Sequence, residues 1–342
     1  MAGRRLTQQQ QGRIQRLQDR RRTRSDQAVP GEEDEAGLGP EQAGLAITNH
    51  GATVIVEDGE GRLQRCSVRQ NLGRLACGDQ VIWQASGPGG GVVTAVVERR
   101  SLLTRPDFQG QPRPVAANLD AVAVVLAPEP NLSEDLIDRY LVAIAAIGVQ
   151  GLLVLNKRDL LDEAALATLL DRLEPYRRMD YPLLLVSSRT AHGLEDLRAW
   201  LRGRTSLLAG QSGVGKSSLI KALLPDRDIR IQALSAATGH GAHTTSASTL
   251  YHLPGGGDLI DTPGVRSFEL GEIRLRDLDR GFADIAPYLG RCRFSDCRHQ
   301  IEPGCALRDA VAGGEIAPRR LASYRQLRAA LETAANPGRP PS

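Results

Sequence analysis

A nine-residue motif, Gly210-Gln211-Ser212-Gly213-Val214-Gly215-Lys216-Ser217-Ser218, constrains the fold of this chain more than any other feature. It fits the pattern G-x-x-x-x-G-K-[ST], in which backbone N–H groups surround the phosphates of a nucleotide. The glycines permit positive φ angles and a close approach of the main chain to those phosphates. Residues 205–209 before the motif are mostly apolar, and residues 217–224 after it have a helical pattern. The sequence therefore predicts a strand, a phosphate-binding loop and a helix whose N-terminus faces the phosphates.

Several polar side chains could complete a nucleotide and magnesium site. We expect Lys216 to reach the β- and γ-phosphates and the Ser217 hydroxyl to bind Mg²⁺. The segment Asp261-Thr262-Pro263-Gly264 follows a short predicted strand, 258–260. There a carboxylate can hold Mg²⁺ through water, and the glycine N–H can meet the γ-phosphate, so the segment could act as a switch. The candidate residues outside the loop are Asp261, Gly264 and a threonine in the polar stretch 240–246, Thr245 or Thr244.

The region before the phosphate loop alternates between apolar strands and helices. Predicted strands cover 119–127, 152–155 and 183–186, and predicted helices cover 131–147, 163–173 and 194–201. Asn131 and Glu134 have the spacing of a capping box at the start of the first helix. This alternation predicts a mostly parallel sheet covered by helices.

Two of these strands are followed by residues suited to recognising guanine. Asn156-Lys157-Arg158-Asp159 follows one strand, and Ser187-Ser188 follows the next. An Asp159 carboxylate can accept hydrogen bonds from both N1–H and the N2 amino group of guanine, a pairing that adenine cannot make. Asn156 could bond the other edge of the base, and the stem of Lys157 could lie along its face. The motif alone is a common surface turn, but its position at the carboxyl end of a strand favours guanine.

A cluster of three cysteines and one histidine lies in the C-terminal part, at Cys292, Cys297, His299 and Cys305. Three thiolates and an imidazole suit tetrahedral Zn²⁺, and because protein atoms would fill all four positions the site should be structural. Metal binding would then contribute to the folding free energy of this domain. Cys66 and Cys77 are expected to be small core residues.

The N-terminal part has a different composition. Residues 1–40 contain an arginine-rich arm followed by acidic residues, which is typical of a disordered tail, and the arm either binds phosphate backbones or is only solvated. Residues 41–105 contain about five short predicted strands and no helix, which suggests an OB-type barrel. Trp83 is the one aromatic residue suited to stacking on a base, so the barrel could bind RNA or serve as a scaffold. Residues 105–118, with three prolines, are expected to form a linker.

The order of these motifs resembles that of the RsgA family of circularly permuted GTPases. The guanine motifs precede the phosphate loop instead of following it, a barrel precedes them and the Cys/His cluster follows. The resemblance implies hydrolysis of GTP, stimulated by the small ribosomal subunit during late subunit maturation. It also implies structural zinc at the Cys/His cluster and binding of rRNA, whose phosphates could be faced by the arginines around that cluster, Arg291, Arg293, Arg298, Arg319 and Arg320. Val265 stands where Ras-like enzymes carry a glutamine that orients the attacking water, so His243 is a candidate for that role. Some members of the family bind K⁺ with the help of an asparagine in the phosphate loop. Gly213 stands at that position here, so the resemblance does not imply potassium dependence for this chain.

These observations define an expected organisation and function. The expected domains are a tail at 1–40, an OB-fold barrel at 41–105, a permuted P-loop GTPase domain at 106–273 and a mainly helical zinc-binding domain at 274–342. No apolar run is long enough to span a membrane, and the start of the chain does not resemble a signal peptide, so we expect a cytoplasmic monomer. The alternatives are an RNA-binding assembly factor with a vestigial GTPase, and an ATPase, which Asp159 disfavours.

Overall fold

The computed structural model describes residues 38–107, 109–129, 131–226, 248–262, 273 and 275–335. The chain divides into two compact units. The first unit comprises Met1–Leu119 and Leu224–Gly264, and the second comprises Asp120–Leu223 and Val265–Ser342. The two units are described separately below.

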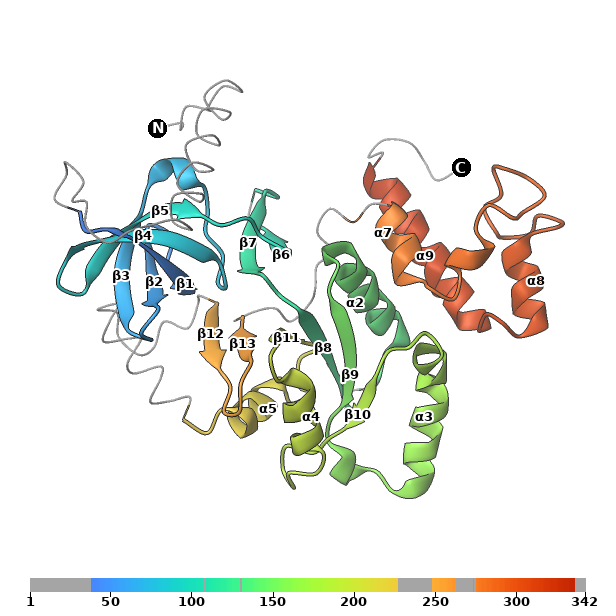
Figure 1. The fold of residues 1–342 in the computed structure, drawn as a ribbon. Helices are drawn as coiled ribbons and strands as arrows, with labels where there is room; N and C mark the ends of the chain where they lie inside the picture. Colours follow the sequence, from blue (N-terminus) through green and yellow to red (C-terminus); the bar gives the residue numbers. More distant parts are fainter. Residues whose placement is uncertain are drawn as a thin grey trace. The chain divides into compact units, whose positions relative to one another are not determined.

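The first unit contains a closed five-stranded barrel (Figure 1). The strands pair in the order β1-β2-β3-β5-β4, and β1 also pairs with β4, which closes the sheet. This confirms the predicted N-terminal barrel. The barrel strands are β1 Glu41–Asn49, β2 Thr53–Asp58, β3 Leu63–Val68, β4 Gln80–Gly87 and β5 Gly90–Val96.

The interior of the barrel is packed with apolar side chains. Val54, Val56, Cys66 and Val93 are completely buried, and Trp83 is only 2% exposed. Cys77 is buried as well, so both cysteines of this unit are core residues as predicted. Because Trp83 fills the core, it cannot stack on a nucleobase, and the one aromatic argument for RNA binding by the barrel is wrong.

Residues 102–117 form a β-hairpin and not the linker that their prolines suggested. Strand β6, Leu102–Pro106, pairs antiparallel with β7, Pro112–Ala117. Pro106 and Pro112 face each other beside the turn, at which the Asp107 carboxylate accepts hydrogen bonds from the N–H groups of residues 109 and 111. Proline is tolerated in a two-stranded ladder because its missing N–H can face away from the partner strand.

A second hairpin in this unit contains Asp261. Strand β12, Thr249–His252, pairs antiparallel with β13, Asp258–Asp261, and Thr249 also pairs with Thr48 of β1. His252 joins the hairpin to the barrel, since its Nδ1 lies 2.7 Å from Asp258 and its Nε2 lies 2.9 Å from Glu57 of β2. The hydrogen bond with Asp258 raises the pKa of His252, burial opposes the rise, and the charge of Glu57 adds to it.

We predict that His252→Gln destabilises the first unit more at pH 6 than at pH 9. A raised folded-state pKa stabilises the fold fully below the unfolded value of about 6.5, and this contribution is lost as the pH rises through the folded-state pKa. Urea unfolding of both proteins at the two pH values measures the difference. His192→Gln, at an exposed histidine of the other unit, is the control. An equal destabilisation at both pH values would contradict the prediction.

The second unit contains a parallel sheet with the order β10-β9-β8-β11 (Figure 1). All six residues of β8 are buried, as expected for a strand covered on both faces. Helix α2 begins after Ser133, whose side chain accepts a hydrogen bond from the N–H of Leu136, so Ser133 and not Asn131 is the N-cap. The strands are β8 Ala121–Leu126, β9 Gln150–Leu155, β10 Leu183–Leu185 and β11 Thr205–Ala209, and the helices are α2 Glu134–Ile147, α3 Glu163–Arg177, α4 Leu194–Leu201 and α5 Lys216–Leu223.

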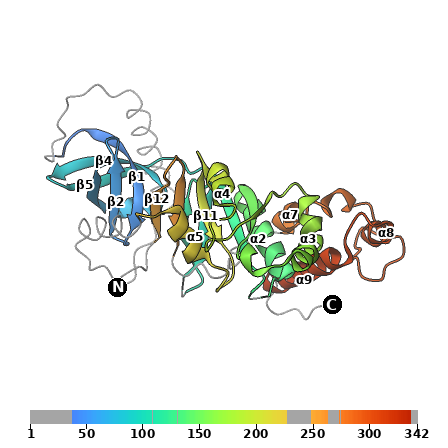
Figure 2. The same cartoon turned by 90° about the horizontal axis from the view of Figure 1, so that it is seen from below.

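The C-terminal helices belong to this same unit, and in Figure 2 α7 and α9 lie alongside α2 while α8 lies farther out. A Cβ atom at Gly281 would lie 2.6 Å from Cα of Val142, so α7 packs backbone to backbone on α2 and needs a glycine there. The region is mainly helical, as predicted. Its elements are α7 Leu275–Gly281, the 3₁₀ helix η3 Ala286–Tyr288, α8 Ala306–Gly313 and α9 Pro318–Ala335.

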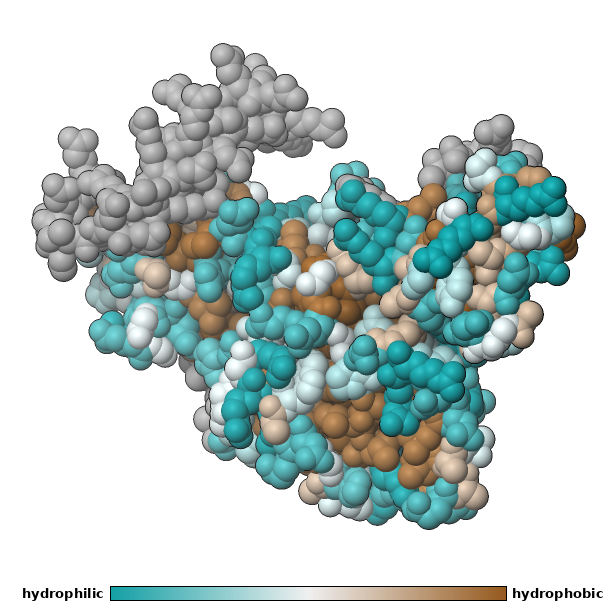
Figure 3. Space-filling model, turned by 45° about the vertical axis from the view of Figure 1, so that its right-hand side comes forward, coloured by the Kyte–Doolittle hydropathy of each residue, from teal (hydrophilic) through white to brown (hydrophobic). Residues whose placement is uncertain are grey.

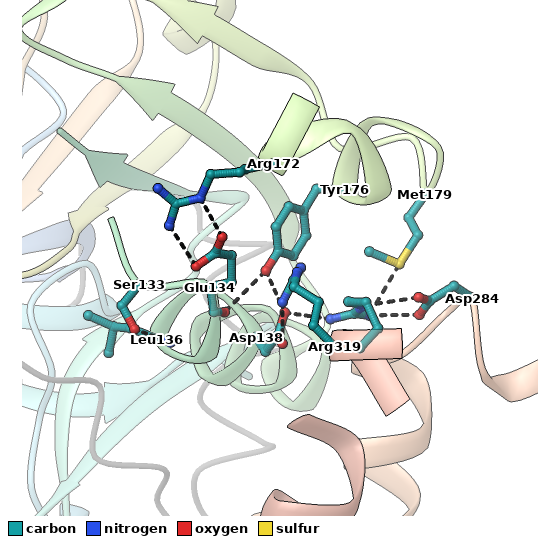
Figure 4. Close-up of polar contacts among 10 residues, drawn as sticks. Ser133, Glu134, Leu136, Asp138, Arg172, Tyr176, Met179, Asp284 and Arg319 are labelled. Carbon is teal, nitrogen blue, oxygen red and sulfur yellow. Dashed lines mark hydrogen bonds and ion pairs between the residues drawn. The ribbon is translucent and has the colours of Figure 1, made fainter. Parts of the chain in front are cut away.

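Figure 4 shows polar side chains around Asp138 of α2, among them Tyr176 of α3, Arg319 of α9, and Asp284. A neighbouring arginine, Arg320, holds α9 against α2. The side chain of Arg320 is fully buried; its Nη1 donates to Asp138 of α2 at 2.5 Å, and its Nη2 donates to Asp284 at 2.7 Å. Its guanidinium also lies 4.2 Å from the ring centroid of Phe282. Tyr176 of α3 donates its hydroxyl to Asp138 at 2.7 Å. Burial alone would lower the pKa of Arg320, but the hydrogen bond with Asp284 and the charge of Asp138 raise it, so the guanidinium stays charged.

We predict that Arg320→Ala destabilises the second unit by about 3–5 kcal/mol, because it removes the cation of Asp284 and leaves the buried Asp138 carboxylate with only the longer, 3.3 Å contact to Arg319. The free energy of unfolding in urea, with hydrogen exchange of α9, measures the loss. Arg177→Ala, which removes an exposed partner of Glu174, should cost less than about 1 kcal/mol. A loss of similar size in both variants would show that the network does not hold α9.

Candidate nucleotide and metal sites

The phosphate-loop motif forms the predicted strand, loop and helix. Strand β11 ends at Ala209, and α5 begins at Lys216. At Gly215 φ is +92°, and a Cβ atom there would lie 2.4 Å from Nδ2 of Asn156. The ammonium group of Lys216 donates to the carbonyl oxygens of Gly210 and Gln211, at 2.6 and 2.7 Å, so it lies over the loop. Phosphate oxygens can replace these two carbonyls as acceptors.

The side chain of Asn156 connects three loops. This residue is completely buried just after β9. Its Nδ2 donates to the carbonyl of Val214 in the phosphate loop at 2.9 Å, and its Oδ1 accepts from the backbone N–H of Ser188 at 3.3 Å. The structure thus shows Asn156 joining residues 187–188 to the phosphate-loop motif, and its predicted contact with a guanine base stays a prediction.

Asp159 lies in the 3₁₀ helix η2, Arg158–Leu160, which follows β9. One carboxylate oxygen, Oδ1, accepts from the hydroxyl of Ser187, and Oδ2 accepts from Nε of Arg189 at 2.8 Å. The hydrogen bond from Ser187, followed by that from Arg189, lowers the pKa of Asp159, so the group is a carboxylate at neutral pH.

Two neighbours of Asp159 make contacts of their own. Lys157 has a φ of +60° and donates its ammonium to the carbonyl of Glu129 at 2.8 Å. Arg158 instead bonds the carbonyl of Leu161 and the carboxylate of Glu163.

The second unit thus brings together 156–159, 187–188 and 210–218, although they are separated along the chain. Asp261 lies at the end of β13 in the first unit. His243, Thr245, Gly264 and Val265 lie outside the described residues, as does the arginine-rich arm. Sequence reasoning missed Arg189, and the available signal was its position directly after Ser187-Ser188.

The C-terminal cluster forms a set of four possible metal ligands. One ligand atom each from Cys292, Cys297, His299 and Cys305 lies within 4.8 Å of the others. Nδ1 of His299 lies 3.4 Å from the sulfur of Cys292 and 3.5 Å from that of Cys305. A nitrogen at about 2.0 Å and a sulfur at about 2.3 Å from one tetrahedral ion lie about 3.5 Å apart, which fits this spacing. The cluster can therefore hold one metal ion.

The surroundings of the cluster suit a metal ligand. Burial, followed by the positive charge of Arg328, lowers the pKa of His299, so the imidazole is neutral as coordination requires. Cys297 and Cys305 are packed in the same apolar core as Phe282 and Tyr324. A metal ion there would hold together the segment 292–305, whose buried cysteines pack in one core with Leu278 of α7 and Tyr324 of α9.

Comparison with known proteins agrees with this geometry. The family model for the RsgA GTPase matches residues 96–271. The chain belongs to the RsgA GTPase family. It is 51% identical over 340 residues to "Small ribosomal subunit biogenesis GTPase RsgA" from Azotobacter vinelandii, covering 97% of this chain and 98% of the relative. The protein of the same name from Pseudomonas aeruginosa is 48% identical over 336 residues, with the same shares covered.

Two solved structures are also similar. YjeQ from Thermotoga maritima has a TM-score of 0.70 and 33% identity, covering 88% of this chain and all of that one. YloQ, described as a circularly permuted GTPase, has a TM-score of 0.68 and 29% identity, covering 89% of this chain and 99% of that one. The resemblance to the permuted family, the predicted fold class and the prediction of a GTP hydrolase are thereby confirmed. Among the described residues, no helix is both long and apolar enough to cross a membrane.

We predict that Asn156→Ala weakens GDP binding about 10-fold or more, because it leaves the carbonyl of Val214 and the N–H of Ser188 unpaired in a buried place. Isothermal titration calorimetry with GDP and Mg²⁺ measures the affinity. Asn118→Ala is the matched control, since it removes a buried amide of the first unit that likewise donates to one backbone group and accepts from another. If Asn156→Ala binds GDP as tightly as the unchanged protein, the loops do not depend on this contact.

Proposed function

We propose that this protein hydrolyses GTP to GDP and phosphate during late maturation of the small ribosomal subunit, and that the subunit stimulates the reaction. The relatives that match nearly the whole chain are named as GTPases of small-subunit biogenesis. The proposal rests on the position of the Asp159 carboxylate beside a phosphate loop. Asn156, three residues earlier, bonds both Val214 of that loop and Ser188, and Ser187 bonds Asp159. A site of this kind binds both ends of a guanine nucleotide.

The two ends of the nucleotide would be bound by different chemistry. Asp159 accepts from N1–H and the N2 amino group of guanine, and the adjoining residues 156–158 and 187–188 enclose the base. Backbone N–H groups of 210–218 and the Lys216 ammonium bind the phosphates and neutralise charge as the γ-phosphoryl group leaves. Mg²⁺, which Ser217 would help to hold, supplies further neutralisation of the phosphate oxygens. Thr245 and Asp261 stay predicted magnesium ligands.

Turnover in the absence of the subunit should be slow. Val265 follows the segment 261–264 at the position where Ras-like enzymes orient the attacking water with a glutamine. Valine has no hydrogen-bonding group for this task, so a group from elsewhere, with His243 as the candidate in this chain, must orient the water.

The C-terminal region would supply contact with rRNA. Arg291, Arg293 and Arg298 surround the Cys/His cluster, and phosphate groups favour such guanidinium donors. Arg320, expected beside them, cannot take this role because it is fully buried against Asp138, and Arg319 pairs with the same carboxylate. On the face shown in Figure 3, the upper right part, which is this helical region, presents mostly hydrophilic residues with a few apolar ones between them. We assign zinc to the cluster because three thiolates and one imidazole with no open position suit structural Zn²⁺. The protein would act as a cytoplasmic monomer.

The direct test of the function is phosphate release from GTP with and without purified small ribosomal subunits. We expect slow release alone, strong stimulation by the subunits, and almost none in Lys216→Ala because charge neutralisation is lost. Lys221→Ala, at an exposed lysine of the same helix, should behave like the unchanged protein. Binding to subunits without any stimulation would favour an assembly factor with a vestigial GTPase, and equal competition by ATP would favour an ATPase.

We predict that Cys292→Ser lowers the zinc content from about one ion per chain and unfolds the C-terminal helices locally, because metal binding contributes to their folding free energy. Elemental analysis and hydrogen exchange of α8 and α9 measure both effects. Cys66→Ala removes a thiol from the barrel core and should leave the zinc content unchanged. Full zinc content in Cys292→Ser would exclude this residue as a ligand.

A further inference from the structure

Arg189 occupies the carboxylate that we assign to guanine recognition. Its side chain is 72% exposed, yet two of its N–H donors point at one oxygen of Asp159. Nε lies 2.8 Å and Nη2 lies 2.7 Å from Oδ2. The other oxygen, Oδ1, accepts the hydroxyl hydrogen of Ser187.

The guanidinium group and the guanine base present the same donor pattern. In arginine, Nε–H and Nη2–H flank one carbon atom, and in guanine, N1–H and the N2 amino group flank C2. A carboxylate pairs with either edge through two parallel N–H donors. Arg189 therefore presents to Asp159 the same pair of donors that guanine would present.

The carboxylate has too few acceptor positions for both partners. Two oxygens offer about four lone-pair directions. Ser187 uses one on Oδ1, and the two donors of Arg189 use those on Oδ2. Guanine needs one acceptor position on each oxygen. At least one N–H of Arg189 must therefore leave Oδ2 before the base can form hydrogen bonds with both oxygens of Asp159.

We propose that Arg189 is an internal competitor for the guanine site, which the base displaces when it binds. The proposal rests on the proposed function, in which Asp159 reads guanine. Arg189 thereby raises the dissociation constant of guanine nucleotides and keeps the Asp159 carboxylate paired while no base is bound. Because the ion pair is exposed, the effect is modest and decreases as salt screens it.

The experiment compares GDP affinity, in the presence of Mg²⁺, between the unchanged protein and Arg189→Ala. Calorimetry at low salt should show about two- to five-fold tighter binding by Arg189→Ala, the range expected for losing one exposed ion pair. At about 1 M salt the ratio of the two dissociation constants should approach one. Arg189→Lys keeps the charge but lacks the paired donors, so its affinity should lie between the two.

Arg178→Ala is the matched control. Arg178 is 70% exposed and pairs with Glu174 at 3.5 Å on α3, so the substitution removes the same charge from a similar exposed ion pair. It should leave GDP affinity unchanged. Equal or weaker GDP binding by Arg189→Ala would overturn the proposal, and weaker binding would show that Arg189 supports the bound base.

Asp159→Asn separates this inference from the proposed function. If it abolishes the preference for GDP over ADP while Arg189→Ala changes nothing, Asp159 reads guanine and the competitor role is wrong. If Asp159→Asn keeps that preference, the assignment of the base site fails and the competitor role fails with it. If both proposals hold, Arg189→Ala should have no effect on GDP affinity in the Asp159→Asn background, since the group that both partners share is gone.

Discussion

The nucleotide site depends on one buried amide. Asn156 contacts the carbonyl of Val214 and the N–H of Ser188, and the space beside it is so limited that residue 215 must be glycine. Backbone groups in loops lack the regular hydrogen-bond partners that helices and strands provide. A buried side-chain amide that donates to one loop and accepts from another therefore fixes the distance between the two loops. The position of the phosphate loop therefore depends on the positions of residues 156–159 and 187–188.

This dependence explains how a permuted chain can build the same kind of site. The sheet order β10-β9-β8-β11 places the carboxyl ends of parallel strands at one edge, whichever strand comes first in sequence. Residues 156–159 follow β9, residues 187–188 follow β10, and the phosphate loop follows β11. Only the strand order in the sheet and the contacts between loops matter to the ligand, so the chain can begin at a different point without changing the chemistry.

Much of this arrangement could be predicted from the sequence because each motif has a strict local pattern. The phosphate loop, the alternation of strands and helices, and the Cys/His cluster all depend on residues close together in the chain. The contact of Asn156 with Val214 could not be predicted, since it joins residues 58 positions apart. The pairing of Arg189 with Asp159 was missed for the same reason, across 30 positions.

The wrong predictions also have local physical causes. The prolines of 105–118 suggested a linker. Pro106 and Pro112 instead flank the turn of a hairpin, where the missing N–H costs no hydrogen bond. Asn131 matched a capping pattern, yet Ser133 stands nearer to the first helical turn and takes the N-cap position. Trp83 was considered as a stacking surface, but a large apolar side chain in a small barrel is needed inside it.

Helix α2 connects the C-terminal helices with the sheet that carries the site. Asp138 on this helix binds the buried Arg320 of α9. Two residues later, Tyr140 contacts the backbone N–H of Gly210 in the phosphate loop; burial raises the pKa of Tyr140 to about 12, and this hydrogen bond opposes the rise. A rigid helix keeps these two contacts in fixed register. Any rotation of the C-terminal helices relative to the parallel sheet must first separate Arg320 from Asp138, which exposes a buried charge to an apolar core. The phosphate loop and the C-terminal helices therefore both contact α2, through Tyr140 and Asp138, so a displacement of this helix would affect both contacts.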